Sequence, residues 1–175
     1  MPRKIISSIK LHSGVVFDVV RDRIREESGN EFSREVVTHS GGAGGVALFD
    51  DGRIALVRQY RHPAKKDLLE IPAGKIDDGE APEICAAREI EEELGWRAGK
   101  LQKLTEFYST PGFCAEKLYL YLATELQPTK QNLDHDEQVE IVYATLDEAL
   151  RMISSGEIED AKTIIALLLV KQIYA

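Results

Sequence analysis

The sequence predicts a mixed α/β sandwich, preceded by a small additional β-sheet at the N-terminus. Strand patterns dominate residues 4–61 and return near 101–108, 117–123 and 139–144, whereas residues 81–94 show helical periodicity. Two further helices are predicted near the C-terminus. Because the order is strands, one helix, strands and two helices, the pattern favours a mixed sandwich over a doubly wound parallel sheet.

The strand predictions for the first 61 residues come from β-branched and apolar runs. These runs lie at 15–20, 34–39 and 45–49, and residues 27–30 predict a turn between the first two. Asp51-Gly52 lies between two apolar segments, and this pair predicts a two-residue hairpin turn with positive φ at both positions.

The first helix is predicted from apolar residues spaced three and four apart, at Ile84, Ala87, Ile90 and Leu94. Pro82 suits a first helical turn, and Gly95 is a typical stop.

Both C-terminal helices carry capping signals. Residues 145–148 form a capping-box pattern that predicts a short helix ending near Gly156. Asp160 predicts the start of the last helix, which continues to about Tyr174 and contains the longest apolar run of the chain.

Charge and composition exclude several classes of function. The 175 residues carry a formal net charge of −8, which disfavours general binding to nucleic acid or to anionic membranes. Two separated cysteines exclude a disulfide scaffold or a thiolate zinc site, and no segment predicts a signal peptide or a membrane span. We therefore expect a cytoplasmic protein.

The excess acid is concentrated on the predicted helix at 81–94. Glu89, Glu92 and Glu93 stand at positions i, i+3 and i+4, which places them on one helix face. Carboxylates grouped in this way suit a hard divalent cation such as Mg²⁺. The alternative from the helix alone is an ordinary solvated acidic surface. We expect the three carboxylates to be exposed and to lie away from the apolar face.

The segment from Gly74 to Trp96 matches the pattern G-x5-E-x7-R-E-U-x-E-E-x-G-U at every fixed polar and glycine position, where U is a bulky apolar residue. The segment resembles the Nudix box; its one mild departure is Trp96, where that family usually has an aliphatic residue. The resemblance implies a Nudix α/β/α sandwich with a mixed sheet, plus a small N-terminal antiparallel sheet.

The resemblance also implies roles for residues of the box. Glu89, Glu92 and Glu93 would bind Mg²⁺, with Mn²⁺ as an alternative, together with the backbone carbonyl of Ala73. Arg88 and Glu80 would orient these carboxylates through charge-assisted hydrogen bonds. The alternative for Arg88 and Glu80 is a surface ion pair.

Motifs outside the box resemble the ADP-ribose pyrophosphatase branch of the family. They are VRQYRHP at 57–63, LLEIPAGKID at 68–77, GEIEDAKTIIALLL at 156–169, and Pro111, sixteen residues after Gly95. Relatives that act on other nucleotide sugars, such as GDP-mannose, share several of these motifs. Hydrolysis of GDP-mannose or of a UDP-sugar is therefore the main alternative to ADP-ribose hydrolysis.

The same resemblance suggests residues that contact the substrate. Arg61 and Glu70 would lie at the ADP-ribose site, the loop at Pro111 and Gly112 would approach the substrate, and Arg34 matches an arginine that reaches a neighbouring subunit's site. The alternatives are surface arginines and a structural carboxylate.

The resemblance also implies a catalytic glutamate, acting as general base, in the acidic segment 132–140. By register the family's two usual glutamate positions fall on His135 and Glu137, so Glu137 is the first candidate and Glu140 the second. His135 is an alternative base, because the ordinary pKa of histidine is near 6.5. Solvated loop charges are the alternative.

The sequence therefore predicts a homodimeric enzyme that cleaves ADP-ribose to AMP and ribose 5-phosphate. Residues 1–42 would form a β segment used in dimerisation, and residues 43–175 the hydrolase domain. A non-catalytic nucleotide sensor is a further alternative, which the intact box glutamates disfavour. The last alternative is a plain acidic interaction domain, which predicts no Mg²⁺-dependent thermal shift.

Overall fold

The computed structural model describes residues 2–133, 135 and 138–174 and divides the chain into two compact units. The first unit comprises residues up to 41 together with residues 107–118. The second unit comprises residues 42–106 and the chain from residue 119 onward. The two units are described separately below.

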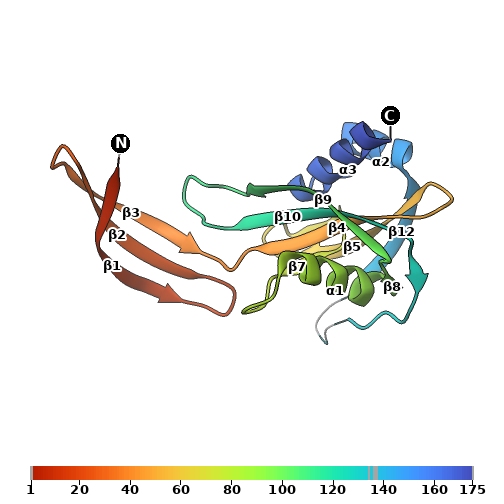
Figure 1. Ribbon diagram of the computed structural model, residues 1–175, viewed down its shortest axis with the longest axis horizontal. Coiled ribbons are helices and arrows are strands. Elements are labelled where there is room, and N and C mark those ends of the chain that lie inside the picture. Colours follow the sequence, from red (N-terminus) through yellow and green to blue (C-terminus); the bar gives the residue numbers. More distant parts are fainter. Residues whose placement is uncertain (1, 134, 136–137, 175) are drawn as a thin grey trace. The chain divides into compact units, whose positions relative to one another are not determined.

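The first unit is built on a three-stranded antiparallel sheet (Figure 1). Its strands are β1 (Arg3–Ser13), β2 (Asp18–Glu26) and β3 (Glu31–Thr38). Residues 107–118 join this unit through Val37, whose N–H donates to Phe113 O at 2.8 Å and whose O accepts from Ala115 N–H at 2.9 Å.

The prediction of a strand over residues 15–17 was wrong. These residues lie in the connection between β1 and β2, which Gly14 N–H closes by donating to Phe17 O at 3.0 Å. Val15 is 95% exposed, so its β-branched side chain is not part of a strand face. The high strand propensity of these residues misplaced the start of the strand, because the turn before Asp18 sets where β2 begins.

The second unit is a sandwich of helices around a sheet. Among the described residues the sheet has seven strands in the order β12-β5-β4-β10-β9, with β6 paired to β5 and β7 paired to β4. The strands of this sheet are β4 (Gly42–Leu48), β5 (Arg53–Arg61), β6 (Lys66–Glu70), β7 (Ala73–Lys75), β9 (Lys100–Tyr108), β10 (Lys117–Thr124) and β12 (Val139–Thr145). The short strands β8 (Trp96–Arg97) and β11 (Gln127–Pro128) pair with each other.

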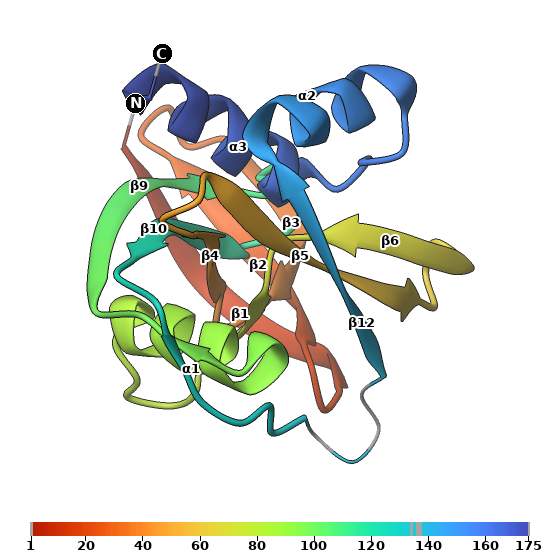
Figure 2. The same cartoon turned by 90° about the vertical axis from the view of Figure 1, so that its right-hand side faces the viewer.

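Helices cover both faces of this sheet (Figure 2). Helix α1 (Pro82–Leu94) lies on one face, and helices α2 (Leu146–Ser155) and α3 (Ala161–Ile173) lie on the other. Ile90 and Leu94 of α1 pack with Ala47, Val57 and Ala123 of the sheet. The predicted α/β/α sandwich with an additional N-terminal antiparallel sheet is thus confirmed.

The hairpin between β4 and β5 forms as predicted, but its turn differs. Gly52 alone has positive φ, at 83°, and Gly52 N–H donates to Phe49 O at 2.9 Å. The connection therefore spans residues 49–52 rather than two residues, and Asp51 instead accepts from Arg53 N–H at 3.0 Å.

The capping signals correctly predicted both C-terminal helices. Thr145 accepts from Glu148 N–H at 3.3 Å, and Glu148 in turn accepts from Thr145 N–H at 2.8 Å, so the capping box is complete. Asp160 caps α3 by accepting from Thr163 N–H at 2.9 Å. In the described part of the chain, none of the helices is long and apolar enough to cross a membrane.

Candidate active site

Helix α1 carries the predicted metal ligands and both of its ends are well defined. Pro82 occupies the first turn, where its missing N–H leaves no intrahelical bond unmade. Gly95 ends the helix in the left-handed conformation, with φ 69°, and its N–H donates to Glu91 O. The box sequence therefore folds locally into a rigid platform with fixed ends.

Residues 129–132 are hydrogen-bonded to the C-terminal end of α1. Thr129 N–H donates to Gly95 O at 2.7 Å, and Asn132 N–H donates to Glu92 O at 2.9 Å. The side-chain amide of Gln131 donates to Glu93 O at 2.7 Å. These bonds satisfy carbonyls that the end of a helix leaves without partners, and they hold the start of the acidic segment against α1.

The expectation of exposed carboxylates was wrong for two of the three. Glu89 is 8% exposed and Glu93 is 2% exposed, whereas Ile84, predicted to be apolar core, is 60% exposed. Cys85, Glu89 and Glu93 recur every fourth residue, and all three side chains face the segment 73–75. Apolar periodicity missed this because it assigns carboxylates to the solvent side.

Arg88 links three carboxylates of the acidic cluster through hydrogen bonds. Its Nε and Nη2 atoms donate to the two carboxylate oxygens of Glu80 at 3.0 and 3.1 Å. Its Nη1 atom donates to Glu89 at 2.7 Å and to Glu92 at 2.9 Å. The hydrogen bond from Arg88 holds the pKa of Glu80 below its ordinary value, and the bond to Glu80 raises the pKa of Arg88.

Gly74 forms a cradle for the Glu89 carboxylate. A Cβ at residue 74 would lie 2.0 Å from Glu89 Oε1 and 2.2 Å from Glu89 Cδ, so no larger residue fits without displacing the carboxylate. On the same segment, Ala73 N–H donates to Glu93 Oε2 at 3.3 Å. The close contact between this segment and α1 therefore depends on the absence of a side chain at 74.

The donor chemistry of this cluster fits a hard divalent cation, because the cluster supplies carboxylate and carbonyl oxygens. Within residues 2–133, 135 and 138–174, however, no three His, Cys, Asp or Glu side chains are arranged as a metal centre. Arg88 Nη1 bonds both Glu89 and Glu92, so a guanidinium bridges two of the predicted ligands.

A second charged group is formed by Arg61, the last residue of β5, and Glu70, the last residue of β6. Arg61 donates through Nε to Glu70 Oε1 at 2.8 Å and through Nη2 to Glu70 Oε2 at 2.9 Å. Glu70 is 1% exposed, whereas the Arg61 side chain is 38% exposed. The bonds to Glu70 raise the pKa of Arg61, and the charges of Glu93 and Asp160 add to this effect. Arg61 thus lies within electrostatic reach of α1.

Sequence reasoning gave no role to Lys162, which also contacts Glu70. Its ammonium pairs with Glu70 Oε2 and with Asp160 Oδ2, the latter at 3.1 Å. Burial alone would raise the pKa of Glu70, but the hydrogen bond from Arg61 and the charge of Lys162 outweigh burial and lower it. The motif at 156–169 was recognised, but its spacing gave no sign of this long-range pair.

Thr163 bonds the first turn of α3 to the chain just after β6. Its hydroxyl accepts from Ile71 N–H at 2.8 Å and donates to Asp160 Oδ2 at 2.6 Å. Because Ile71 lies two residues before Ala73, the start of α3 is linked to the segment that faces the α1 carboxylates.

Of the two candidate general bases, Glu140 lies within the described residues and Glu137 does not. Glu140 lies on β12 opposite Arg58, with Oε2 3.7 Å from Arg58 Nε, and its side chain is 72% exposed.

Three predicted substrate-binding residues belong to the first unit, whereas α1 belongs to the second. The Arg34 guanidinium lies 4.6 Å from the centroid of the Phe32 ring and donates to Ser33 O at 3.0 Å. Pro111 and Gly112 are exposed in the connection between β9 and β10.

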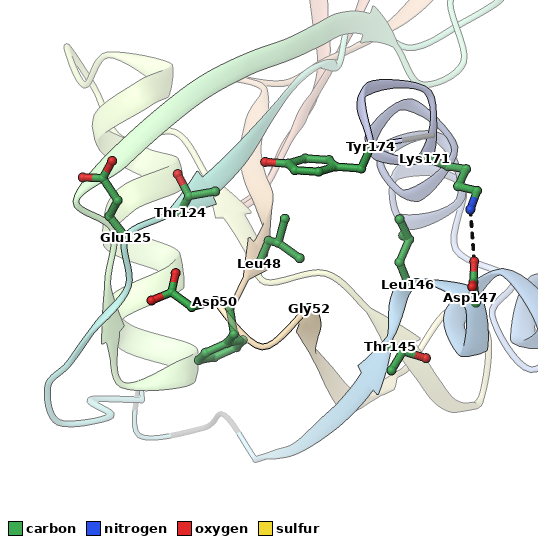
Figure 3. A pocket seen from close by; sticks show the side chains of 11 residues that line it. Leu48, Asp50, Gly52, Thr124, Glu125, Thr145, Leu146, Asp147, Lys171 and Tyr174 are labelled. Atoms are coloured by element: carbon green, nitrogen blue, oxygen red, sulfur yellow. Dashed lines mark hydrogen bonds and ion pairs between the residues drawn. The ribbon is translucent and has the colours of Figure 1, made fainter.

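The cavities of the second unit include two with different linings. One, of about 320 Å³, borders Arg88 and Glu92 and is also lined by Glu91, Lys130 and Asn132. The other, of about 610 Å³, is lined by none of the predicted site residues. Figure 3 shows the latter, with Tyr174 and Leu146 on its walls and Lys171 paired to Asp147 at 3.1 Å. The first cavity thus adjoins Glu92, one of the predicted metal ligands.

Comparison with known proteins places the box within a longer match. The NUDIX domain family model matches residues 38–167. The chain is 41% identical to an ADP-ribose pyrophosphatase of Bacillus subtilis over 95% of this chain and 91% of that protein. It is 40% identical to a methanol dehydrogenase activator of Bacillus methanolicus over 94% of this chain and 90% of that protein.

More distant relatives agree with this assignment. A GDP-mannose pyrophosphatase of Yersinia pestis is 36% identical over 90% of this chain and 82% of that protein. The crystal structure of an ADP compounds hydrolase shares the fold, with a TM-score of 0.85 and 22% identity over 99% of this chain and 94% of that one. With the Nudix box intact and matched over most of its length, the chain belongs to the Nudix family of hydrolases.

Proposed function

We propose that this protein hydrolyses the pyrophosphate bond of ADP-ribose, giving AMP and ribose 5-phosphate in a Mg²⁺-dependent reaction. The observation that carries the proposal is the packing of Glu89 and Glu93 against the segment 73–75. Burying two carboxylates on one helix face is costly for folding alone. A bound divalent cation would offset the cost of burying these two carboxylates.

Glu89, Glu92 and Glu93, together with the carbonyl of Ala73, would hold the cation. When bound, the metal supplies positive charge that neutralises phosphate oxygens and promotes the ionisation of water. Arg88 acts through its bonds to Glu89 and Glu92, and Glu80 fixes Arg88 by its two bonds. Arg88 is therefore a positioning residue rather than one that touches the substrate.

Substrate binding is assigned to residues outside α1. Arg61 has a partly exposed side chain beside the buried Glu70, and a cation in this place suits a pyrophosphate oxygen. From the resemblance alone, Pro111 and Gly112 stay proposed substrate contacts, and Arg34 is proposed to reach the site of a neighbouring subunit. Glu137 is proposed to accept the proton of the attacking water, with Glu140 as the alternative base.

The choice of ADP-ribose is supported by the Bacillus subtilis relative, which is an ADP-ribose pyrophosphatase. Another nucleotide sugar is the second candidate, because the Yersinia pestis relative is a GDP-mannose pyrophosphatase. Catalysis is favoured over a sensor role because the glutamates and the arginine of the box are joined in one hydrogen-bonded cluster.

A substrate panel tests this proposal directly. Wild-type protein with Mg²⁺ is expected to convert ADP-ribose faster than GDP-mannose, a UDP-sugar or NADH. Released monophosphates are measured as inorganic phosphate after treatment with alkaline phosphatase, which does not attack the intact diphosphates. Preference for GDP-mannose would replace the substrate assignment, and no turnover of any compound would refute the enzyme assignment.

Chelation provides the second arm of the same experiment. In this arm AMP is quantified directly by chromatography, because EDTA also inactivates alkaline phosphatase. EDTA is expected to abolish turnover, and added Mg²⁺ is expected to restore it. Mg²⁺ is also expected to raise Tm, because a ligand that binds only the folded state stabilises that state. Turnover that persists in EDTA would contradict the metal dependence.

The protein is further proposed to act as a homodimer through residues 1–42. On β1, Ile5, Ile9 and Leu11 are 58%, 53% and 43% exposed, and such apolar surface suits contact with a second copy. Light scattering is expected to give twice the chain mass of 19.6 kDa. A monomer with full activity would contradict this proposal. A cytoplasmic location stays a prediction.

A further inference from the structure

We infer that Lys162, in the first turn of α3, is a positioning residue that fixes Glu70 so that Glu70 presents Arg61 to the substrate. The inference rests on the proposed function only for the identity of the substrate. It assigns to the start of α3 a role in the site, which the box and its neighbouring motifs do not suggest.

The geometry of Arg61 is the first step. Its two bonds to Glu70 use Nε and Nη2 and engage both carboxylate oxygens, which fixes the plane of the guanidinium. Among the described residues, Nη1 of Arg61 has no hydrogen-bond partner. These two bonds between Arg61 and Glu70 are called the fork below. The fork leaves other N–H donors of Arg61 available to an anionic ligand and keeps the direction of these donors constant.

The position of Glu70 is the second step, because both bonds of the fork end on its carboxylate. The Glu70 carboxylate is buried, and a buried charge needs partners that match it. Lys162 provides the second cation on Oε2, and the Lys162 side chain is only 12% exposed. Without Lys162, Glu70 would keep one partner, and that partner is the partly exposed Arg61.

The third step is that Lys162 is itself held in place. Its ammonium lies 3.1 Å from Asp160 Oδ2, the oxygen that also caps α3 through Thr163. The Thr163 hydroxyl binds Ile71 N–H, directly after Glu70. The first turn of α3 therefore fixes both the side chain of Glu70 and the backbone that follows it.

The test compares Lys162→Met with Lys162→Arg and with Lys171→Met. Lys171→Met is the matched control, because Lys171 lies on the same helix and pairs with Asp147 beside the separate cavity of Figure 3. Steady-state kinetics with ADP-ribose give KM and kcat. The exchange rate of the Arg61 Nε–H with water, from ¹⁵N NMR without ligand, reports directly on the fork. The resonance is assigned by its loss in Arg61→Lys.

Lys162→Met is expected to raise KM about tenfold and to change kcat less than about threefold, because Arg61 would bind ground state and transition state alike. Its Arg61 Nε–H is expected to exchange at least about tenfold faster, because the hydrogen bond that protects it loosens. Lys162→Arg is expected to restore KM and the exchange rate to within about threefold of wild type, because it keeps the charge. Lys171→Met is expected to match wild type in both.

Unchanged KM and unchanged exchange in Lys162→Met would overturn the inference. A fall in Tm and kcat with neither KM nor exchange altered would also overturn it, since that result describes a purely structural lysine. If Lys162→Met does not fold, Lys162→Gln serves in the same comparison. If wild type does not act on ADP-ribose, the proposed function fails, and the exchange rate alone then decides the role of Lys162.

Discussion

Replacing Glu93 with glutamine is expected to lower kcat by at least about 10²-fold at saturating ADP-ribose and Mg²⁺, because one preorganised charge at the reacting group is lost. Glutamine has the same shape and keeps a carbonyl oxygen that can accept the bond from Ala73 N–H. The substitution also removes a buried charge. The free energy of unfolding is therefore expected to stay within about 1 kcal/mol of wild type.

The measurement pairs turnover with denaturant unfolding, and Glu91→Gln is its control. Glu91 lies on the same helix but forms an ion pair with Arg97, at 2.7 and 3.0 Å, and surface pairs of this kind contribute little to stability. Glu91→Gln is expected to leave kcat unchanged. Turnover of Glu93→Gln within about threefold of wild type would refute its role as a metal ligand.

The same assay separates the two candidate bases. Glu137→Gln is expected to lower kcat by about 10²-fold or more, the usual contribution of a general base. Glu140→Gln is expected to have a much smaller effect, because Glu140 is largely exposed and near Arg58. A larger loss in Glu140→Gln than in Glu137→Gln would reverse this assignment.

A single methyl group at residue 74 is expected to have the second large effect. In Gly74→Ala the new Cβ would lie 2.0 Å from Glu89 Oε1, so the carboxylate or the segment 73–75 must shift. Misplacement of a catalytic group by about 1 Å can cost about 10²-fold in rate. We therefore expect kcat to fall by about 10²-fold and the Mg²⁺ concentration for half-maximal activity to rise.

Gly52→Ala is the control for this substitution. Gly52 has φ 83° and open space around its Cα, so alanine there strains the β4–β5 turn without touching α1. It is expected to lose about 1 kcal/mol of stability and to keep its turnover. Equal turnover in Gly74→Ala and wild type would show that the close approach of Gly74 to Glu89 has no part in catalysis.

Local signals in the sequence predicted the elements well. The capping box at 145–148, the cap at Asp160 and the stop at Gly95 all act over a few residues, and the structure has each of them. The errors also have local causes. At residues 15–17 strand propensity competed with a turn, and at Asp51 a two-residue turn competed with a longer one.

The candidate site was predictable only in part. The box identified Arg88 and the three glutamates, but helical periodicity assigned Glu89 and Glu93 to the solvent side. The burial of Glu89 depends on Gly74, whose lack of a side chain lets the segment 73–75 lie against the Glu89 carboxylate. The pair of Lys162 with Glu70 joins residues 92 positions apart. A single sequence has no periodicity that reports contacts over such a separation.

The position of Arg88 has a consequence for the order in which the molecule assembles. Its guanidinium already binds Glu89 and Glu92, so it serves as an internal counterion that offsets their mutual repulsion. Small metal-dependent domains such as zinc fingers fold only when their ion is present. Here Arg88 supplies positive charge from within the chain, so we expect the protein to fold without a divalent cation and to bind the cation afterwards.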